Sequence, residues 1–419
     1  MTSQPALSRR LSLSDAVFVG LGSMVGAGVF AAFTPAARAA GNGLLIGLVV
    51  AAIVAFCNAT SSAQLAAVYP SSGGTYVYGR ERLGPWWGFL AGWSFVIGKI
   101  ASCAAMALTF AAYAAPAGWE RPVAVAAVVG LAAVNYVGVT RTALVTRVIV
   151  VISLLALAIV VAAGASEGIG ASDWSGGALI SHGWYGILQS AGLLFFAFAG
   201  YARIATMGEE VRDPSRTIPL AITIALAITV VVYGVIAVTI LGALGATGVA
   251  ASSAPLADTV RASGWAWAGP VVRVGAAAAS LGALLALIAG IGRTSLAMAR
   301  EGDLPRWLAA VHPRYRVPHR AEVAIAVVVV TLVLTIDLRG AIGFSSFGVL
   351  LYYFVANLAA LSQPREQRRY PRAVQVVGAL ACLTLAATLP AAGIVVGVIV
   401  ILVGVGYRLA SRRANRRGA

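Results

Sequence analysis

The chain has 419 residues, of which 60% are hydrophobic and 11% are charged. A soluble domain carries about 25% charged residues, so this composition excludes a soluble protein and predicts an all-α integral membrane protein. The net charge of +16 comes from basic residues in the short segments between apolar runs, a pattern that predicts membrane topology and no nucleic acid partner.

The apolar runs predict about twelve transmembrane helices, because a helix crosses the hydrocarbon core in about 20 residues. The predicted spans are 14–39, 43–68, 86–114, 122–138, 143–164, 184–207, 217–244, 268–298, 321–337, 341–361, 373–389 and 391–410. If the N-terminus is cytoplasmic, most of the 30 Lys and Arg residues fall on the inner side, as topology requires. We therefore expect a multi-pass protein of the plasma membrane with both termini in the cytoplasm.

The order of the spans divides the chain into four parts. We expect a cytoplasmic tail over 1–13, a transport core of ten helices over 14–361, two further helices over 362–410 and a basic cytoplasmic tail over 411–419. The arginines of the last tail suit contact with anionic lipid headgroups. The three Cys and three His residues lack metal-ligand spacing, so we expect no metal, no cofactor and no enzymatic activity.

The first span contains three glycines near its middle, Gly22, Gly26 and Gly28. Each glycine costs a helix roughly 1 kcal/mol relative to alanine, so the spacing predicts that the helix breaks inside the membrane. The backbone groups freed by a break must face protein, water or a ligand. The second half-helix would direct its positive N-terminal end at a carboxylate, and the freed carbonyls would accept an ammonium. Close helix packing through Gly22 and Gly26, a G-x-x-x-G pair, is the alternative interpretation.

A second break is predicted in the sixth span at residues 198–201, where Gly200 is the only glycine. A break here corresponds to the break in the first span if spans one to five and six to ten form two inverted halves. Interrupted spans at matching positions of two repeats indicate the binding site of a secondary transporter. The sequence thus predicts a 5+5 inverted repeat with helices 1 and 6 broken at mid-membrane.

Four motifs occur in the order found in one superfamily of transporters. Residues 22–30 resemble its unwound first helix, and residues 69–78 resemble its loop between helices 2 and 3. Residues 195–201, followed by 208–214, resemble helix 6 and its cytoplasmic loop, and residues 293–305 resemble the loop after helix 8. On these motifs the chain resembles the amino acid–polyamine–organocation (APC) superfamily, and within it the permeases similar to cationic amino acid transporters.

This resemblance implies the leucine-transporter-type fold and transport by alternating access. It implies that backbone N–H groups of Gly26, Ala27 and Gly28 bind the substrate carboxylate beside the second break at Gly200. Phe196 would form an aromatic gate over the substrate, or else pack as an ordinary apolar side chain. The carbonyl groups implied to accept the substrate ammonium are those near Ser23, Met24, Phe196 and Ala199.

Two positions depart from the family pattern. Ser153 lies where proton-coupled relatives carry a lysine in helix 5, and serine cannot serve as a base. Ala202 lies where relatives with cationic substrates often carry an acid, so a neutral substrate is favoured. Sodium coupling would require hard oxygen ligands, for which the carbonyls of Gly22 and Val25 and the hydroxyl of Ser280 are the candidates.

Two basic residues, Lys99 and Arg203, fall within predicted spans and are assigned to neither side of the membrane. Lys99 lies about 12 residues into the third span, roughly 18 Å along a helix, where a lysine costs at least about 2.5–3.5 kcal/mol. Either Lys99 takes over the coupling role of the helix 5 lysine, or backbone carbonyls hold it near the cytoplasmic vestibule. Arg203 is expected to form a gate ion pair with Glu209, Glu210 or Asp15; a counter-charge for an anionic substrate is the alternative.

Taken together, these features predict a proton-coupled symporter that carries neutral amino acids by alternating access. Three alternatives stay open: an exchanger or exporter of the same fold, a sodium-coupled symporter, and more remotely a membrane sensor that transports nothing. The expected partners are an amino acid, a proton or sodium ion, and membrane lipid. The sequence leaves open which amino acid is carried, in which direction, and by what oligomer.

Overall fold

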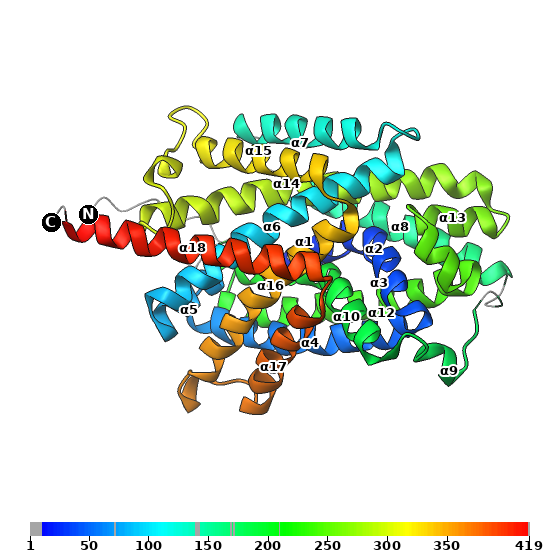
Figure 1. The fold of residues 1–419 in the computed structure, drawn as a ribbon, viewed down its shortest axis with the longest axis horizontal. Helices are drawn as coiled ribbons and strands as arrows, with labels where there is room; N and C mark the ends of the chain where they lie inside the picture. The colour runs from blue at the N-terminus through cyan, green and yellow to red at the C-terminus, as the bar shows by residue number, and fades with distance from the viewer. Residues whose placement is uncertain are drawn as a thin grey trace.

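The computed structural model of this chain describes residues 11–70, 73–138, 143–167, 170, 172–208 and 210–417. Most of its helices run along the long axis of the molecule and pack side by side (Figure 1). Within the described residues, the one extended pairing is an isolated parallel bridge between Leu11 and Val211. The fold is therefore all-α, as the composition predicts.

The helices follow one another with mostly short connections. In chain order they are α1 (Leu13–Met24), α2 (Ala27–Ala31), α3 (Phe33–Ala40), α4 (Leu44–Val68), α5 (Thr75–Leu83), α6 (Pro85–Ala114), α7 (Glu120–Tyr136), α8 (Ala143–Glu167), α9 (Gly176–Leu179), α10 (Gly183–Phe198), α11 (Ala202–Ala205), α12 (Pro214–Ala251), α13 (Pro255–Ala262), α14 (Gly269–Arg300), α15 (His319–Thr335), α16 (Leu338–Leu361), α17 (Arg372–Thr388) and α18 (Ala391–Arg417). Each of the predicted spans overlaps one of these helices or a run of consecutive ones.

Within the described chain, nine helical stretches are long and apolar enough to cross a membrane. This is three fewer than the predicted number of spans, and the difference has a physical cause. The helices α7, α15 and α17 have 17 residues each, which gives about 26 Å at 1.5 Å per residue, short of a hydrocarbon core of about 30 Å. The apolar stretch Phe33–Val68 joins α3 to α4, which shifts the boundary between the first two spans without changing their number. Twelve crossings and the 5+5 repeat therefore remain predictions.

The start of α1 is fixed by local hydrogen bonds and by one ion pair. The backbone N–H of Asp15 donates to the hydroxyl of Ser12 (3.3 Å), and the N–H of Ser12 donates to the Asp15 carboxylate (3.0 Å), a reciprocal cap. The same carboxylate pairs with Arg147 of α8 at 2.6 Å. Asp15 is thus engaged at the beginning of the helix whose other end carries the first predicted break.

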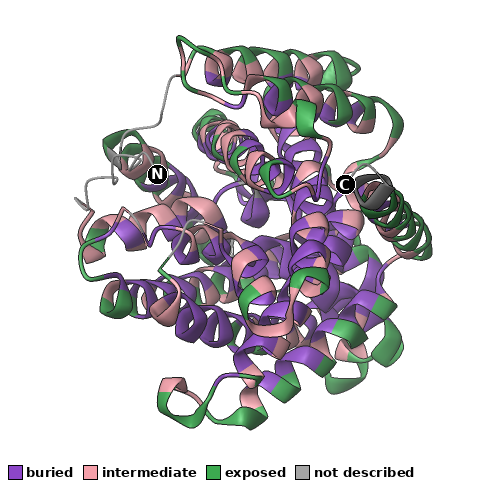
Figure 2. Ribbon diagram, turned by 90° about the vertical axis from the view of Figure 1, so that its left-hand side faces the viewer, coloured by how far each residue is buried: buried purple, intermediate pink, exposed green. Residues whose placement is uncertain are grey.

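Buried residues gather in the middle of the bundle, and exposed residues lie at its rim (Figure 2). The long helix α6 packs along both α14 and α16, while α10 packs against α4. Outer helices expose apolar side chains, such as Val395, Ile399 and Leu402 of α18. An apolar rim is what a helical protein in contact with lipid requires, because lipid tails do not penalise exposed hydrocarbon.

Candidate substrate site

The first helix breaks at the position that its glycines predict. The helix α1 ends at Met24, Val25 caps it by donating its N–H to the carbonyl of Leu21 (2.7 Å), and Gly26 leaves helical geometry with ψ −139°. A second helical segment then starts at Ala27 and continues through Ala32 into α3. The break separates two helical segments that meet at Val25 and Gly26.

Close helix packing, the alternative interpretation of these glycines, is also supported, at Gly22. Gly22 stays inside α1, and a Cβ on it would lie 3.0 Å from Val150 and 3.2 Å from Thr146 of α8. Gly22 therefore permits close contact between α1 and α8, whereas Gly26 lies at the break itself. Gly22 and Gly26 therefore have different structural roles.

The second break is a tightened turn rather than an unwound segment. The helix α10 ends at Phe198, a 3₁₀ turn covers Ala199–Tyr201, and α11 begins at Ala202. The N–H of Ala199 donates to the carbonyls of both Phe195 and Phe196. A 3₁₀ stretch in mid-helix often marks a functional hinge, so the predicted interruption is present with milder geometry than expected.

The two breaks lie directly against each other. A Cβ on Gly200 would collide with the carbonyl of Ser23 and lie 2.7 Å from the backbone nitrogen of Met24. A Cβ on Gly28 would lie 2.7 Å from the Cα of Ala197. Only glycine permits this approach, which brings together the residues that the sequence assigns to substrate binding.

Buried side chains from other helices hold the carbonyls around the breaks. The hydroxyl of Tyr233, on α12, lies 2.6 Å from the carbonyl oxygen of Met24 and 3.1 Å from that of Ala197, and it shares its one hydrogen between them. The ammonium of Lys99 donates to the carbonyl of Ala199 (3.3 Å), and the hydroxyl of Tyr353 lies 3.5 Å from the same oxygen. The backbone groups thus find protein partners, as the membrane interior requires.

Sequence reasoning did not single out Tyr233 or Tyr353. Both are fully buried in apolar helices, where a tyrosine needs a partner for its hydroxyl. A tyrosine within an apolar span could therefore have indicated a buried hydrogen bond. Its partner carbonyl, however, lies on a distant part of the chain and could not be identified from the sequence. Phe196 is also buried, with 6% of its surface exposed, and lies among the residues of the second break.

Lys99 lies midway along α6 and is 7% exposed. Among the described residues, its one hydrogen bond is the one to Ala199, and no carboxylate lies within ion-pair distance of it. A buried ammonium without a carboxylate is costly. The structure therefore places this charge at the second break, held by a backbone carbonyl.

Arg203 forms an ion pair with one of its three predicted partners. Its guanidinium lies 3.3 Å from the carboxylate of Glu210, whereas Asp15 pairs with Arg147. Glu209 lies outside the described residues. The backbone around Glu210 is tied to the start of the chain, because Leu11 donates its N–H to the carbonyl of Glu210 (3.1 Å).

A narrow pocket with no room for a water molecule lies beside the first break. Its lining is Gly22, Val25, Gly26, Ile149, Val150, Ser153 and Ala279. Ser153 faces it from α8, with its hydroxyl donating to the carbonyl of Ile149 (2.8 Å). Ser280 is buried without a hydrogen-bond partner but does not line this pocket. Of the three residues considered as sodium ligands, Gly22 and Val25 line this pocket, and Ser280 follows the lining residue Ala279 in sequence.

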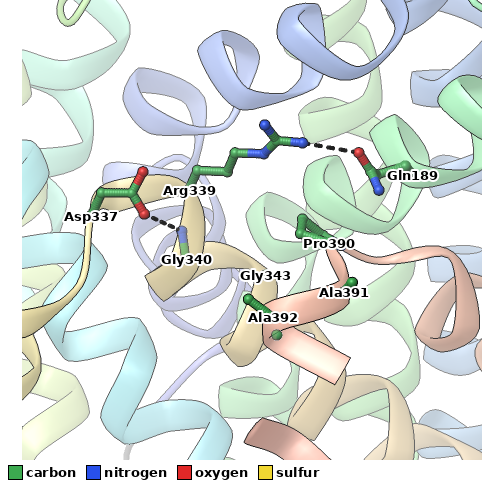
Figure 3. Close-up of a pocket in the computed structure, with 9 residues that line it drawn as sticks. Gln189, Asp337, Arg339, Gly340, Gly343, Pro390, Ala391 and Ala392 are labelled. Carbon is green, nitrogen blue, oxygen red and sulfur yellow. Dashed lines mark hydrogen bonds between the residues drawn. The ribbon is translucent and has the colours of Figure 1, made fainter. Parts of the chain in front are cut away.

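A larger cavity, of about 370 Å³, lies away from the breaks where α10, α16 and α18 meet (Figure 3). Arg339 donates to the side-chain oxygen of Gln189 across it (3.0 Å), and Asp337 accepts the N–H of Gly340 (2.8 Å). These contacts tie the beginning of α16 to α10. The cavity contains none of the residues that the sequence assigns to the substrate.

Two of the motif segments meet at another charged cluster. Tyr76 of α5 donates to Asp303 (2.9 Å), and Arg80 pairs with Glu301 (2.7 Å) and Asp303 (3.6 Å). The fully buried Arg408 of α18 lies 3.2 Å from Asp303. The ends of α5 and α18 lie at the same end of the molecule (Figure 1). The segments 69–78 and 293–305, remote in sequence, are thus joined by the hydrogen bond from Tyr76 to Asp303, and the ion pairs of Arg80 lie beside it.

Several helices are apolar and long enough to cross a membrane, and two of them are interrupted and packed break against break. This is the architecture of a membrane transport protein. The family match described next is likewise to transporters and not to enzymes. The family model described as amino acid permease matches residues 11–411, and the chain belongs to this family. The expected membership of the APC superfamily is therefore confirmed.

Individual relatives support the same family. The chain is 56% identical over 98% of its length to an uncharacterized transporter of Mycobacterium tuberculosis, and covers 94% of it. It is 30% identical over 85% of its length to human cationic amino acid transporter 4, of which it covers 60%. It is 25% identical over 99% of its length to the branched-chain amino acid permease of Bacillus subtilis, of which it covers 96%.

Proposed function

We propose that this permease is a secondary transporter of neutral amino acids in the plasma membrane, coupled to protons and working by alternating access. The observation that carries the proposal is the contact between the two breaks, with Gly200 against Ser23 and Met24. Backbone N–H and C=O groups that converge at interrupted helices suit a ligand with one carboxylate and one ammonium. In this proposal, α1–α3 and α10–α11 take matching positions in two inverted halves, and both termini are cytoplasmic.

The chemistry around the breaks supports a neutral substrate. The residues in contact there offer carbonyls, the apolar rings of Phe196 and Phe198, and the phenol of Tyr201, and none is a carboxylate. A cationic side chain buried at this depth would need a carboxylate. The branched-chain amino acid permease among the relatives bears a name that agrees with a neutral apolar substrate.

The buried charge at the breaks supports protons as the coupling ion. Lys99 is the side chain at this depth that can exchange a proton near neutral pH when buried, and Ser153 cannot. The sequence favours symport, in which proton and substrate move in the same direction. The contact of Lys99 with Ala199 favours exchange of a proton for the substrate instead. Both arrangements require that a proton gradient alter uptake.

Uptake by the purified full-length protein in liposomes tests the proposal. Radiolabelled leucine, alanine, glycine, arginine and putrescine are offered with an imposed pH gradient, with a sodium gradient, and with neither. We expect leucine or alanine uptake well above that of protein-free liposomes and dependent on the pH gradient. Uptake of arginine or putrescine alone, or dependence on sodium alone, would overturn the proposed substrate class or coupling ion.

A further inference from the structure

We propose that the ammonium of Lys99 occupies the position of the substrate ammonium at the second break, so that substrate and the Lys99 proton compete for the carbonyl of Ala199. This inference rests on the proposed function and deepens it. It assigns the order of events at the site: an amino acid binds as Lys99 leaves this carbonyl and gives up its proton.

The geometry at Ala199 leaves little room for a third donor. The ammonium of Lys99 lies 3.3 Å and the hydroxyl of Tyr353 lies 3.5 Å from the same carbonyl oxygen. A carbonyl oxygen has two lone pairs, so these two donors fill its capacity. A substrate ammonium can bind this oxygen only if one of them moves away.

Lys99 is the donor whose departure changes charge. It is 7% exposed, and among the described residues it makes one hydrogen bond and no ion pair. Two ammonium groups side by side in a buried site repel each other strongly, because the surrounding dielectric is low. The repulsion is relieved if the Lys99 ammonium becomes an amine and its proton passes to water, while the amino acid stays a zwitterion.

The titratable groups near Lys99 do not offer the proton another destination. Cys103 lies one turn further along α6 than Lys99. Around Ala199, α16 contributes Tyr353 and the 3₁₀ turn contributes Tyr201, with ring centroids 5.0 Å apart. A thiol and two phenols already carry their protons at neutral pH and cannot accept another, so the proton leaves the site.

Competition of this kind fixes the sign of coupling. Substrate affinity should weaken as pH falls, because protonated Lys99 holds the Ala199 carbonyl more firmly. A carrier that binds either a proton or an amino acid at one site exchanges one for the other across the membrane. Symport, the arrangement that the sequence favours, requires the opposite, with tighter substrate binding at low pH.

Proton release on binding is the direct test, with leucine as the probe. Purified full-length protein at about pH 6.5 is mixed with leucine in weakly buffered solution that contains a pH indicator dye, and leucine affinity is measured between about pH 5.5 and 7.5. We expect close to one proton released per leucine bound. The dissociation constant should rise about tenfold for each unit fall in pH while Lys99 is protonated.

Two variants separate the titrating group from the hydrogen bond. Lys99→Met keeps the length of the side chain without the amine; it should bind leucine more tightly, without proton release or pH dependence. Tyr353→Phe removes the other donor to Ala199; it should change affinity but keep the proton release. Lys99 is the one lysine of the chain, so an unaltered release in Lys99→Met would assign the proton elsewhere.

The outcomes distinguish this inference from the proposed function. Leucine binding by wild-type protein without proton release, or with proton uptake, would overturn the competition and leave a neutral amino acid transporter standing. Failure of wild-type protein to bind or transport any neutral amino acid would overturn the proposed function and this inference with it. Proton release is measured on the wild-type protein, so this test does not require that any variant fold.

Discussion

The hydroxyl of Tyr233 joins the two helix breaks, since it lies 2.6 Å from the carbonyl oxygen of Met24 and 3.1 Å from that of Ala197. Met24 ends α1 and Ala197 lies in the last turn of α10, while Tyr233 belongs to α12. One buried side chain therefore satisfies a carbonyl of each interrupted helix. Its ring also packs on Phe198 at a tilt of 54°, with centroids 5.0 Å apart.

The first prediction removes this hydroxyl. Tyr233→Phe should lower the stability of the protein by about 1–3 kcal/mol, because it leaves buried carbonyls without a donor. It should also alter leucine affinity, since the Met24 carbonyl becomes free to accept the substrate ammonium. Thermal unfolding and leucine binding of the purified variant measure both effects. Tyr185→Phe, at an exposed position of α10, is the matched control and should leave both unchanged.

A second prediction concerns the contact of the breaks themselves. Gly200→Ala should abolish most leucine uptake and destabilise the protein by about 1–3 kcal/mol, because the new Cβ collides with the backbone at Ser23 and Met24. Gly290→Ala is the control: it lies inside α14 with no atom within 4 Å of its added Cβ, so it should be neutral or stabilising by up to about 1 kcal/mol. Equal uptake by the two variants would show that the breaks need not touch for transport.

Much of the framework was predictable because membrane helices are encoded locally. The apolar runs mark the helices, since about 20 apolar residues in a row can satisfy their own backbone only as a helix. The break at Gly26 was predictable for the same reason, because glycine weakens a helix at its own position. Lys99 was recognisable as an anomaly from its depth in an apolar run alone.

The partners at the site were not predictable, because they come from distant parts of the chain. Nothing around Lys99 in the sequence indicates that its ammonium reaches Ala199, a hundred residues further along. The same holds for Tyr233 with Met24. The second break was predicted from Gly200, yet its 3₁₀ form depends on the packing of Gly200 against Ser23. Local rules give the elements, and tertiary contacts decide which groups meet.

A third prediction tests the ion pair of Arg203 and Glu210 as a gate. Their charged atoms lie 3.3 Å apart, and about a third of each side chain is exposed. A partly exposed pair contributes little stability, about 0–1 kcal/mol, so Arg203→Glu should reduce leucine uptake far more than it lowers the melting temperature. The exchanged variant Arg203→Glu with Glu210→Arg should recover a large part of the uptake. No recovery would favour contact of Arg203 with substrate rather than with Glu210.

The buried ion pair between Arg408 and Asp303 gives a fourth prediction. Besides its contact with Asp303 at 3.2 Å, the Arg408 guanidinium lies over the rings of Trp86 and Phe89, 4.8 and 4.5 Å from their centroids. Removing one partner leaves the other charge buried alone, at a cost of about 3–5 kcal/mol, whereas replacing both is nearly neutral. Arg408→Met should lower the melting temperature, because it leaves the Asp303 carboxylate buried alone, and the double variant Asp303→Asn with Arg408→Met should lose clearly less. A double variant that loses as much as Arg408→Met would show that the unpaired Asp303 charge is not what destabilises the single variant.

The pH dependence of stability gives a fifth prediction, which also concerns Asp303. Burial raises the pKa of this carboxyl above the usual value, and the charge of Arg408 offsets this only in part. Because the folded pKa exceeds the unfolded value of about 3.9, the folded protein binds the proton more tightly. The stabilising contribution is fully present below the unfolded pKa and is lost as pH rises through the folded pKa.

The melting temperature of wild-type protein should therefore fall, relative to Asp303→Asn, as pH rises through this window. Glu81→Gln, which removes an exposed carboxylate of α5, is the control, and wild-type and Asp303→Asn curves that run parallel from about pH 4 to 7 would contradict the prediction.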